Sequence, residues 1–425
     1  MQRDHRGLNF DWIIIVLFIL ILGFGWLNIM SASHSGNISS YFDMSQPYGR
    51  QSVFIILNFV LIVLILALDV KFYERFASVI YIISIISLVG LFVFGKTVSG
   101  ATAWYGIGGM TIQPGEFAKF ATSLAVAKYM SDLQTNMKTF KDQLKTMGII
   151  VLPALLILMQ NDAGSTVVYA AFFFVFYREG LQQIYLVIAI FLILLSILAL
   201  KFNVVTAAVV SGILIFAHHF FGHKKRPQIL QPIAILLACV AVSFGIKYFY
   251  NNALQIHQKD RISLWLRLES DASTLHEMKQ TILYNLHESE KAISSGGLTG
   301  KGFMQGTRTT GKFVPEQHTD YIFSTVGEEW GFMGSALVVL LFVALLLRIL
   351  YLAELQKSTF SRVYGYCVAS ILFFHFMINI GMVMGLIPTI GIPLPFFSYG
   401  GSALWAFTIL LFIFVKLDSN RINEW

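Results

Sequence analysis

Long apolar runs separated by short polar stretches fill most of this 425-residue chain. A helix needs about 20 apolar residues to cross the roughly 30 Å of hydrocarbon in a bilayer. By that measure about twelve segments are candidate spans, near 12–31, 51–69, 77–95, 116–130, 146–160, 164–178, 183–200, 203–221, 229–248, 333–353, 363–385 and 402–416. The pattern predicts an all-α polytopic membrane protein: a single bundle of about 10–12 transmembrane helices formed by residues 1–425.

The longest polar stretch between two spans is residues 249–332. Apolar residues recur there at helix-like spacing from Leu264 to Ile293, which predicts helices lying on the membrane surface. From Ser294 the stretch becomes rich in Gly, Thr, Lys and Arg, and it ends near Asp320. A large polar loop in so apolar a chain favours chemistry or recognition, so we expect 249–332 to be the functional loop.

A second irregular stretch, residues 385–403 (GLIPTIGIPLPFFSYGGSA), contains three prolines and four glycines. Proline removes a hydrogen-bond donor and glycine weakens a helix, so an ordinary spanning helix is excluded. Irregular backbone at membrane depth is tolerated only where it is buried in protein or lines a cavity. The stretch therefore predicts a re-entrant segment beside a polar cavity; the alternative is an ordinary outer loop.

Composition and charge support the membrane assignment. Charged residues make up 12% of the chain, against about 25% in soluble domains, and the mean hydropathy is +0.70. Most basic residues fall in alternate loops, so the net charge of +7 reflects the positive-inside rule and gives no indication of nucleic-acid binding. Both termini are then cytoplasmic and the 249–332 loop lies outside. Cys239 and Cys367 sit in apolar runs, and we expect packing residues and no disulfide.

Charged side chains inside spans are costly and usually face a cavity or a partner. Glu116 and Lys119 are three residues apart, hence neighbours on one helical face. They form either a structural ion pair or part of a functional cavity. Asp162 lies at a break between two apolar runs, where it either caps a helix starting near Ala163 or serves a site.

Asp320 stands where the polar loop leads into an apolar helix. An N-cap role and a chemical role are compatible for such a residue. Glu328 follows by about two helical turns, which places it near the same helix face. The two residues indicate a carboxylate site at the membrane surface.

Two other groups invite a site interpretation. His218, His219 and His223 lie beside a basic cluster at the end of a span, and we interpret them as interfacial anchors, not as metal ligands. The run GGLTGKG (296–302) lacks the spacing of a nucleotide-binding loop. Its backbone N–H groups and lysine would suit a lipid-linked pyrophosphate.

Four segments together resemble the SEDS family (shape, elongation, division and sporulation) of polytopic peptidoglycan glycosyltransferases. They are AISSGGLTGKGFMQGT (292–307), FVPEQHTDYIF (313–323), GEEWGFMGS (327–335) and NIGMVMGLIPTIGIPLPFFSYGGSAL (379–404). The last resembles the elongation branch, which is RodA-like, more than the division branch, which is FtsW-like. The chain departs from the family where Ala103 precedes Trp104, since relatives commonly have Arg there. The family has about ten spans, so residues 201–248 are predicted to be an extra helix pair, peripheral to the chemistry.

The resemblance implies the polymerisation of lipid II into glycan strands at the outer face of the bacterial cytoplasmic membrane. It implies that Asp320 is the catalytic base. We expect the substrate-binding residues to be Glu116, Lys119, Arg261, Lys301, Lys312, His318 and Ser398; of these, Glu116 and Lys119 would support either the substrate or the Asp320 region. The one cofactor that the chemistry leaves open is a divalent cation, Mg²⁺ or Mn²⁺. The implied partners are a class B penicillin-binding protein, which is a transpeptidase, and the cell-elongation machinery.

Two further classes fit the same residues less well. A flippase or transporter for lipid II would also need intramembrane charges and broken helices, but transporter sites lie near the midplane, while the densest polar cluster here is in the outer loop. A scaffold without activity is the third class. A division-specific polymerase is the alternative within the family.

Overall fold

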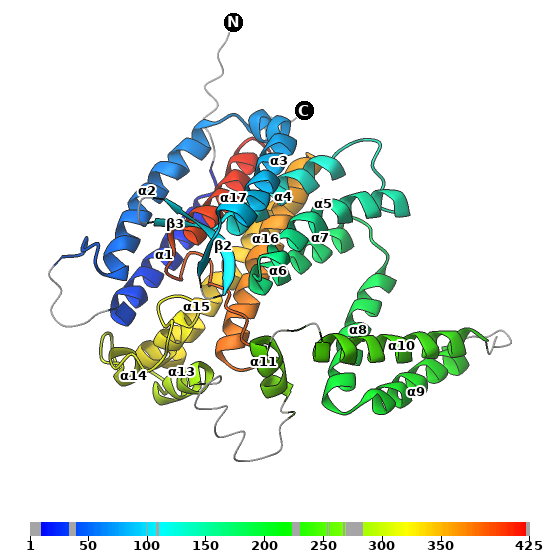
Figure 1. The fold of residues 1–425 in the computed structure, drawn as a ribbon. Coiled ribbons are helices and arrows are strands. Elements are labelled where there is room, and N and C mark those ends of the chain that lie inside the picture. Colours follow the sequence, from blue (N-terminus) through cyan, green and yellow to red (C-terminus); the bar gives the residue numbers. More distant parts are fainter. Residues whose placement is uncertain are drawn as a thin grey trace, which may run out of the picture. The chain divides into compact units, whose positions relative to one another are not determined.

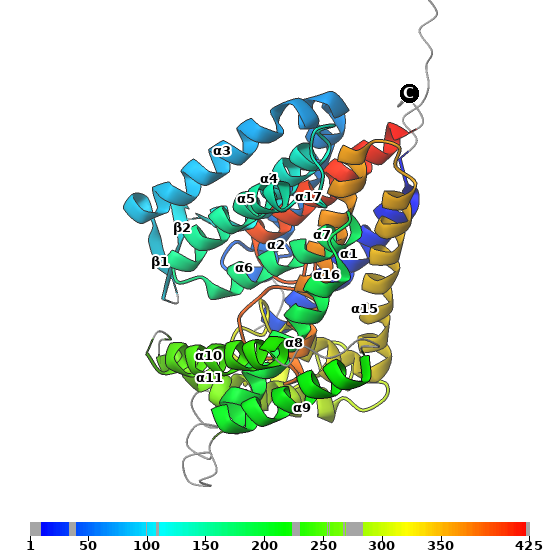
Figure 2. The same cartoon turned by 90° about the vertical axis from the view of Figure 1, so that its right-hand side faces the viewer.

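The computed structural model describes residues 10–33, 40–98, 100–107, 110–222, 230–252, 254, 256–266, 268 and 284–421. The chain divides into two compact units, and each is described by itself. The first comprises 1–181, 288–384 and 390–425, and the second 182–287 and 385–389. Helices dominate both, as Figures 1 and 2 show.

Helices of the first unit begin where the sequence provides a cap or a proline. Pro47 and Pro114 occupy the first turns of α2 and α4, where the missing N–H costs nothing. Asp69 accepts a hydrogen bond from Lys71 N and caps α3. The helices up to the second unit are α1 (Trp12–Ser33), α2 (Pro47–Ala67), α3 (Val70–Phe94), α4 (Pro114–Met130), α5 (Phe140–Met159), α6 (Ala163–Val168), the 3₁₀ turn η1 (Tyr169–Ala171) and α7 (Phe172–Arg178).

The remaining helices complete both units. The second unit holds α8 (Gln183–Lys201), α9 (Val204–Gly222) and α10 (Leu230–Asn252), which pack on one another, and α11 (Ile256–Leu266). After α13 (Tyr284–Ser295) the first unit continues with α14 (Thr307–Thr310), α15 (Ile322–Glu354), α16 (Thr359–Val383) and α17 (Gly401–Ser419). Whether 201–248 is an extra, peripheral pair stays a prediction.

Among the residues described, nine helices are long and apolar enough to cross a membrane: α1, α2, α3, α5, α8, α10, α15, α16 and α17. Two shorter apolar stretches, Ala163–Arg178 and Val204–Ala217, and the 17-residue α4 account for the other predicted spans. A helix therefore occupies each of the twelve predicted segments, and the polytopic helical fold is confirmed.

Helices α16 and α17 form the centre of the first unit. Their most apolar windows are 72% and 78% buried, more than those of any other described span. Helix α16 packs on α4 and α15, while α17 packs on α2 and α4 (Figure 1). Lys416 Nζ donates to Leu66 O at 2.8 Å, and Gly400 N donates to Gln51 Oε1 at 3.2 Å. Both hydrogen bonds tie the last helix region to α2.

A small antiparallel sheet between α3 and α4 was not expected from the sequence. Its strands are β1 (Lys96–Val98), β2 (Ala101–Ile107) and β3 (Met110–Ile112), in that order, with Tyr105 opposite Ile112. Thr102 N donates to Gln160 O at 3.0 Å, which ties β2 to the end of α5. The strands are short, so they leave the helical character of the fold unchanged.

Candidate active site

The irregular stretch 385–403, called the Pro/Gly-rich segment from here on, and α16 hold the backbone at Asp320. As predicted, residues 390–400 of that segment contain no helix, but its last three residues, 401–403, already form the start of α17. Each carbonyl oxygen of residues 318–320 accepts a hydrogen bond: His318 O from Tyr399 N (2.9 Å), Thr319 O from Ser398 Oγ (2.7 Å) and Asp320 O from Asn379 Nδ2 (2.8 Å). Three consecutive anchored carbonyls fix the path of the chain through Asp320.

The structure corrects one expectation for Asp320. Helix α15 begins at Ile322, and its N-cap is Tyr321, without a side-chain cap hydrogen bond. The reason is that Tyr321 N donates to Glu316 O (3.2 Å), so the turn before the helix extends past Asp320. The Asp320 side chain is partly exposed, and its Oδ2 would lie 3.2 Å from a Cβ placed on Gly391, which has φ +80°. The carboxylate therefore lies against the Pro/Gly-rich segment.

Ser398 and His318, two predicted substrate-binding residues, flank Asp320. Ser398 is buried; its Oγ accepts from Leu394 N (2.9 Å) and donates its proton to Thr319 O. His318 lies against the ring of Tyr399, with 5.4 Å between centroids. Burial lowers the pKa of His318, so the ring is neutral at pH 7. Both residues help to shape the surroundings of Asp320, and their contact with substrate stays a prediction.

Glu116 and Lys119 form the predicted pair on α4, with Lys119 Nζ 2.6 Å from Glu116 Oε1. They are only 3% and 2% exposed. Lys119 Nζ also lies 2.9 Å from His375 Nε2 on α16 and over the ring of Phe407. The ion pair is thus real and buried, and it has a third partner that sequence reasoning missed.

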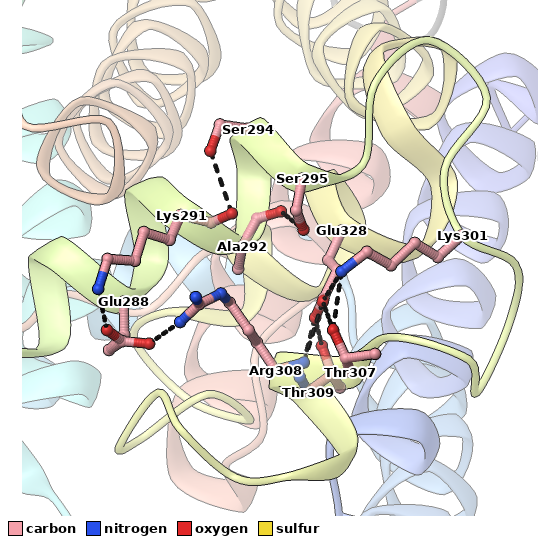
Figure 3. Close-up of polar contacts among 10 residues, drawn as sticks. All are labelled: Glu288, Lys291, Ala292, Ser294, Ser295, Lys301, Thr307, Arg308, Thr309 and Glu328. Carbon is pink, nitrogen blue, oxygen red and sulfur yellow. Dashed lines mark hydrogen bonds and ion pairs between the residues drawn. The ribbon is translucent and has the colours of Figure 1, made fainter.

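Glu328 is fully buried and holds the loop before Asp320. Figure 3 shows its two oxygens facing a turn of the chain. They accept five hydrogen bonds: from Lys301 Nζ (2.7 Å), Thr307 Oγ1 (3.2 Å), Arg308 N (3.0 Å), Thr309 N (2.8 Å) and Thr309 Oγ1 (2.8 Å). So many donors leave Glu328 a structural carboxylate, and Lys301 belongs to the same cluster.

A second carboxylate, Glu288 on α13, supports the same turn from the other side (Figure 3). It pairs with Arg308 and with Lys291, whose Nζ is 2.8 Å from Glu288 Oε1. Arg308 is therefore held through its backbone N–H by Glu328 and through its guanidinium by Glu288. Two buried carboxylates and three cations make the 301–309 turn a fixed part of the fold.

The Gly-rich run 296–302 packs against a break in α15. Gly331 has φ +63° and ψ −156°, a conformation that is essentially restricted to glycine. At the break, Lys301 N and Gly302 N donate to Glu328 O and Glu329 O, and Phe332 N donates to Gly297 O, at 2.9–3.0 Å. The N–H groups of Lys301 and Gly302 are thus used within the fold, so an anion site on these two groups is not supported.

The other predicted residues lie apart from these clusters. Lys312 is exposed, with φ +53°, in the loop before Asp320. Arg261 is exposed on α11 in the second unit, and its part in the site stays a prediction. Asp162 caps α6 by accepting from Ser165 N (2.9 Å), which confirms its structural alternative. Cys239 and Cys367 are buried free thiols, as expected.

The part of the chain that the structure describes contains no preformed metal site. No group of three or more His, Cys, Asp or Glu side chains is placed there to hold an ion. The side chains of His218, His219 and His223 lie outside the described residues. A cation near Asp320 would therefore need other ligands in addition to these side chains, such as substrate oxygens.

Asn379 and His375 are the site residues that the sequence interpretation missed. They lie one helical turn apart in the apolar run FHFMINIG, at the i, i+4 spacing that places two side chains on one face. Asn379 is fully buried and donates to both Asp320 O and Ile392 O. Two polar residues on one face of a spanning helix were the available signal.

The fold and the site define a polytopic membrane protein whose polar residues gather around one aspartate at the start of a helix. A family model described as "Cell cycle protein" (FtsW/RodA/SpoVE) matches residues 11–220 and 176–423. The chain belongs to this family. Two of the four segments that carry the resemblance, 313–323 and 379–404, contain Asp320 and the residues that bind the backbone of 318–320.

Curated relatives match over nearly the whole chain. The peptidoglycan glycosyltransferase RodA of Treponema pallidum is 29% identical, over 98% of this chain and 99% of that one. MrdB of Escherichia coli K12, also named a peptidoglycan glycosyltransferase, is 30% identical over 86% and 84%. A probable peptidoglycan glycosyltransferase FtsW of Bacillus subtilis is 27% identical over 97% and 93%.

Solved structures share the fold. A chain described under "Structural coordination of polymerization and crosslinking by a peptidoglycan synthase complex" aligns with a TM-score of 0.70 at 24% identity, covering 98% of this chain and 100% of that one. The rod shape determining protein RodA of Thermus thermophilus aligns with a TM-score of 0.61 at 22% identity, covering 98% of each. These alignments support the arrangement of helices.

Proposed function

We propose that this chain is a peptidoglycan glycosyltransferase of the RodA type, which polymerises lipid II at the outer face of the cytoplasmic membrane during cell elongation. Family membership and the names of the relatives support the reaction class. The observation that carries the site is the anchoring of residues 318–320 by three carbonyl hydrogen bonds. It presents one partly exposed carboxylate, Asp320, at a fixed position.

Asp320 acts as the general base. A sugar hydroxyl of the acceptor attacks the anomeric carbon of the donor, and the new C–O bond forms as the bond to the pyrophosphate oxygen breaks. Asp320 takes the hydroxyl proton, and the electron pair of the broken bond leaves with the polyprenyl pyrophosphate. A base held within about 2.6–3.2 Å of the hydroxyl contributes about 10²–10⁴-fold to such a step.

The leaving pyrophosphate needs positive charge as its negative charge develops. Lys312 and Arg261 are the exposed predicted cations, whereas Lys301 is paired with Glu328. A divalent cation, Mg²⁺ or Mn²⁺, would supply further charge, and it binds through few carboxylates together with phosphate oxygens. Adding EDTA and then restoring Mg²⁺ in the polymerisation assay tests this contribution.

The decisive experiment incubates the purified full chain with labelled lipid II. Wild type is expected to form glycan polymer, and Asp320→Asn, which keeps the size and removes the basicity, is expected to lose at least about 100-fold of the rate while eluting as a folded protein. Translocation of lipid II in vesicles without polymer would favour the flippase. Wild-type rates from a folded Asp320→Asn protein would contradict the assignment of the base.

We also propose a class B penicillin-binding protein as the partner, because a transpeptidase would use the strands that a polymerase makes. Adding such a protein to the lipid II assay is expected to increase polymer yield and to allow cross-linking. A homologous soluble transpeptidase domain without its membrane anchor is the matched control.

A further inference from the structure

Two buried polar side chains of α16 hold adjacent carbonyls of the Pro/Gly-rich segment. His375 Nδ1 lies 3.2 Å from Pro393 O, and Asn379 Nδ2 lies 2.7 Å from Ile392 O. A carbonyl oxygen can only accept, so both side chains are the donors. They are 1% and 0% exposed. The segment is thus attached to α16 at two consecutive residues.

The other ring nitrogen of His375 faces the buried ion pair. Because Nδ1 carries the proton that goes to Pro393 O, Nε2 of the neutral ring accepts from Lys119 Nζ at 2.9 Å. The same ammonium donates to Glu116 Oε1 at 2.6 Å. One continuous hydrogen-bonded series therefore runs from Glu116 through Lys119 and His375 to Pro393.

The segment held by that series in turn holds Asp320. Asn379 donates to Ile392 O and to Asp320 O with the same amide group, and Ser398 and Tyr399 bind the two preceding carbonyls. Gly391 backs the Asp320 carboxylate. A shift of the segment at Pro393 would move the backbone that presents Asp320.

We infer that Glu116, Lys119 and His375 are positioning residues: they fix the Pro393 carbonyl, and through the Pro/Gly-rich segment they set where Asp320 stands. This inference rests on the proposed function. It replaces the expectation that Glu116 and Lys119 bind substrate, because both are almost fully buried and their charged ends face each other and His375.

The side chain of residue 375 must donate a hydrogen bond to Pro393 O and accept one from Lys119. Glutamine can do both with its amide, whereas leucine has a similar bulk and can do neither. His375→Leu is therefore the disrupting variant and His375→Gln the rescuing one. Tyr73→Phe on α3, which removes a buried hydrogen bond to Ile65 O of α2, is the matched control for loss of one interior hydrogen bond.

The assay measures lipid II polymerisation by the purified full chain, giving kcat and KM for each variant. Lipid II affinity is measured separately in an Asp320→Asn background, where no turnover occurs. His375→Leu is expected to lower kcat by about 100-fold, the scale of a misplaced reacting group, with lipid II affinity within about twofold of the parent. His375→Gln is expected to recover most of kcat, and Tyr73→Phe to resemble wild type.

Non-additivity gives the second criterion. Lys119→Met alone should lower kcat as His375→Leu does, and the double variant should be no slower than the worse single, since residues in one series act as a unit. Loss of lipid II affinity in Lys119→Met, or multiplied effects in the double variant, would show that the pair contacts substrate and would overturn the inference.

The outcomes separate this inference from the proposed function. Wild-type protein that makes no polymer refutes both, whereas active wild type with an unaffected His375→Leu variant refutes the inference alone. Should His375→Leu not elute as a folded protein, Glu116→Gln, which removes the charge at constant size, serves in its place. Reduced kcat with unchanged affinity supports positioning, and any other result contradicts it.

Discussion

Three acidic side chains near the start of α15 have different surroundings and therefore different roles. Asp320 is partly exposed beside Gly391, whereas Glu328 is buried beneath five donors and Glu329 accepts from Ser31 Oγ at 2.5 Å. Burying a carboxylate is costly unless its oxygens are paired or hydrogen-bonded. Glu328 meets that condition by fixing the 301–309 turn.

Glu328→Gln should loosen this turn. The amide replaces one acceptor oxygen with a donor that faces other donors, and it leaves the Lys301 ammonium without its partner. Lys301 is partly exposed, so the loss of stability is smaller than the about 3–5 kcal/mol for removing one member of a fully buried pair. Hydrogen exchange measured on peptides covering 301–310 should rise markedly, with a lower unfolding temperature. The exposed Glu290→Gln on α13 should change neither; unchanged exchange in Glu328→Gln would show that the carboxylate is dispensable.

For single residues, the sequence showed which charged side chains are unusual, but it did not show which contacts they make. Asp320, Glu116 and Lys119 stand out because charged groups are rare in apolar surroundings. His375 and Asn379 also interrupt an apolar run, but their roles could not be predicted, because their partners Pro393 and Ile392 lie 18 and 13 residues further on and no spacing rule links them. Which carboxylate is buried under donors depends on a loop fold that local pattern does not encode.

Among the elements, α15 shows why helix length alone misleads. Its 33 residues would extend about 50 Å, well beyond one span. The break at Gly331 separates a buried first part, which carries Glu328 and Glu329, from the apolar part that the sequence predicted as 333–353. The helix therefore serves the site with one part and the membrane with the other.

Gly331→Ala should destabilise the break that separates the two parts of α15. A Cβ at that position would lie 2.3 Å from Gly300 N and 2.9 Å from Gly297 O, and the backbone conformation itself costs about 1–3 kcal/mol for a residue with a side chain. We expect poor yield and a lowered unfolding temperature in detergent. Gly148→Ala in α5, where nothing lies within 4 Å of the added Cβ, is the control and should be neutral or stabilising. Equal stability of the two variants would contradict the strain argument.

Helices were predictable as elements because each apolar run is long, whereas the sheet was not. The β2 sequence ATAWYGI is short and lies between two spans, where its aromatic and β-branched residues merge with the apolar pattern. The Pro/Gly-rich segment could be recognised as non-helical from composition. Its pairing with residues 318–320 could not, since that pairing joins positions about eighty apart.

For the molecule as a whole, the distribution of basic residues predicts which side each loop occupies. In spheroplasts of a cell expressing the chain, a membrane-impermeant maleimide should label Gln305→Cys directly and Lys138→Cys only after permeabilisation. Both positions are exposed, and the native Cys239 and Cys367 are buried, which keeps the background low. The unsubstituted chain is the control. The reverse labelling pattern would invert the predicted topology and place Asp320 on the cytoplasmic side.

The ties between α2 and the last helix region have a consequence for biogenesis. Lys416 reaches Leu66 O and Gly400 reaches Gln51 across 350 and 349 residues of chain. Helices enter the bilayer in the order of their synthesis, so α2 waits for almost the whole protein before these partners exist. Such distant contacts make assembly slow and leave the growing chain incomplete for longer. A chain that stops before Gly400 thus lacks α17, one of the two central helices of its first unit, together with both of these hydrogen bonds to α2.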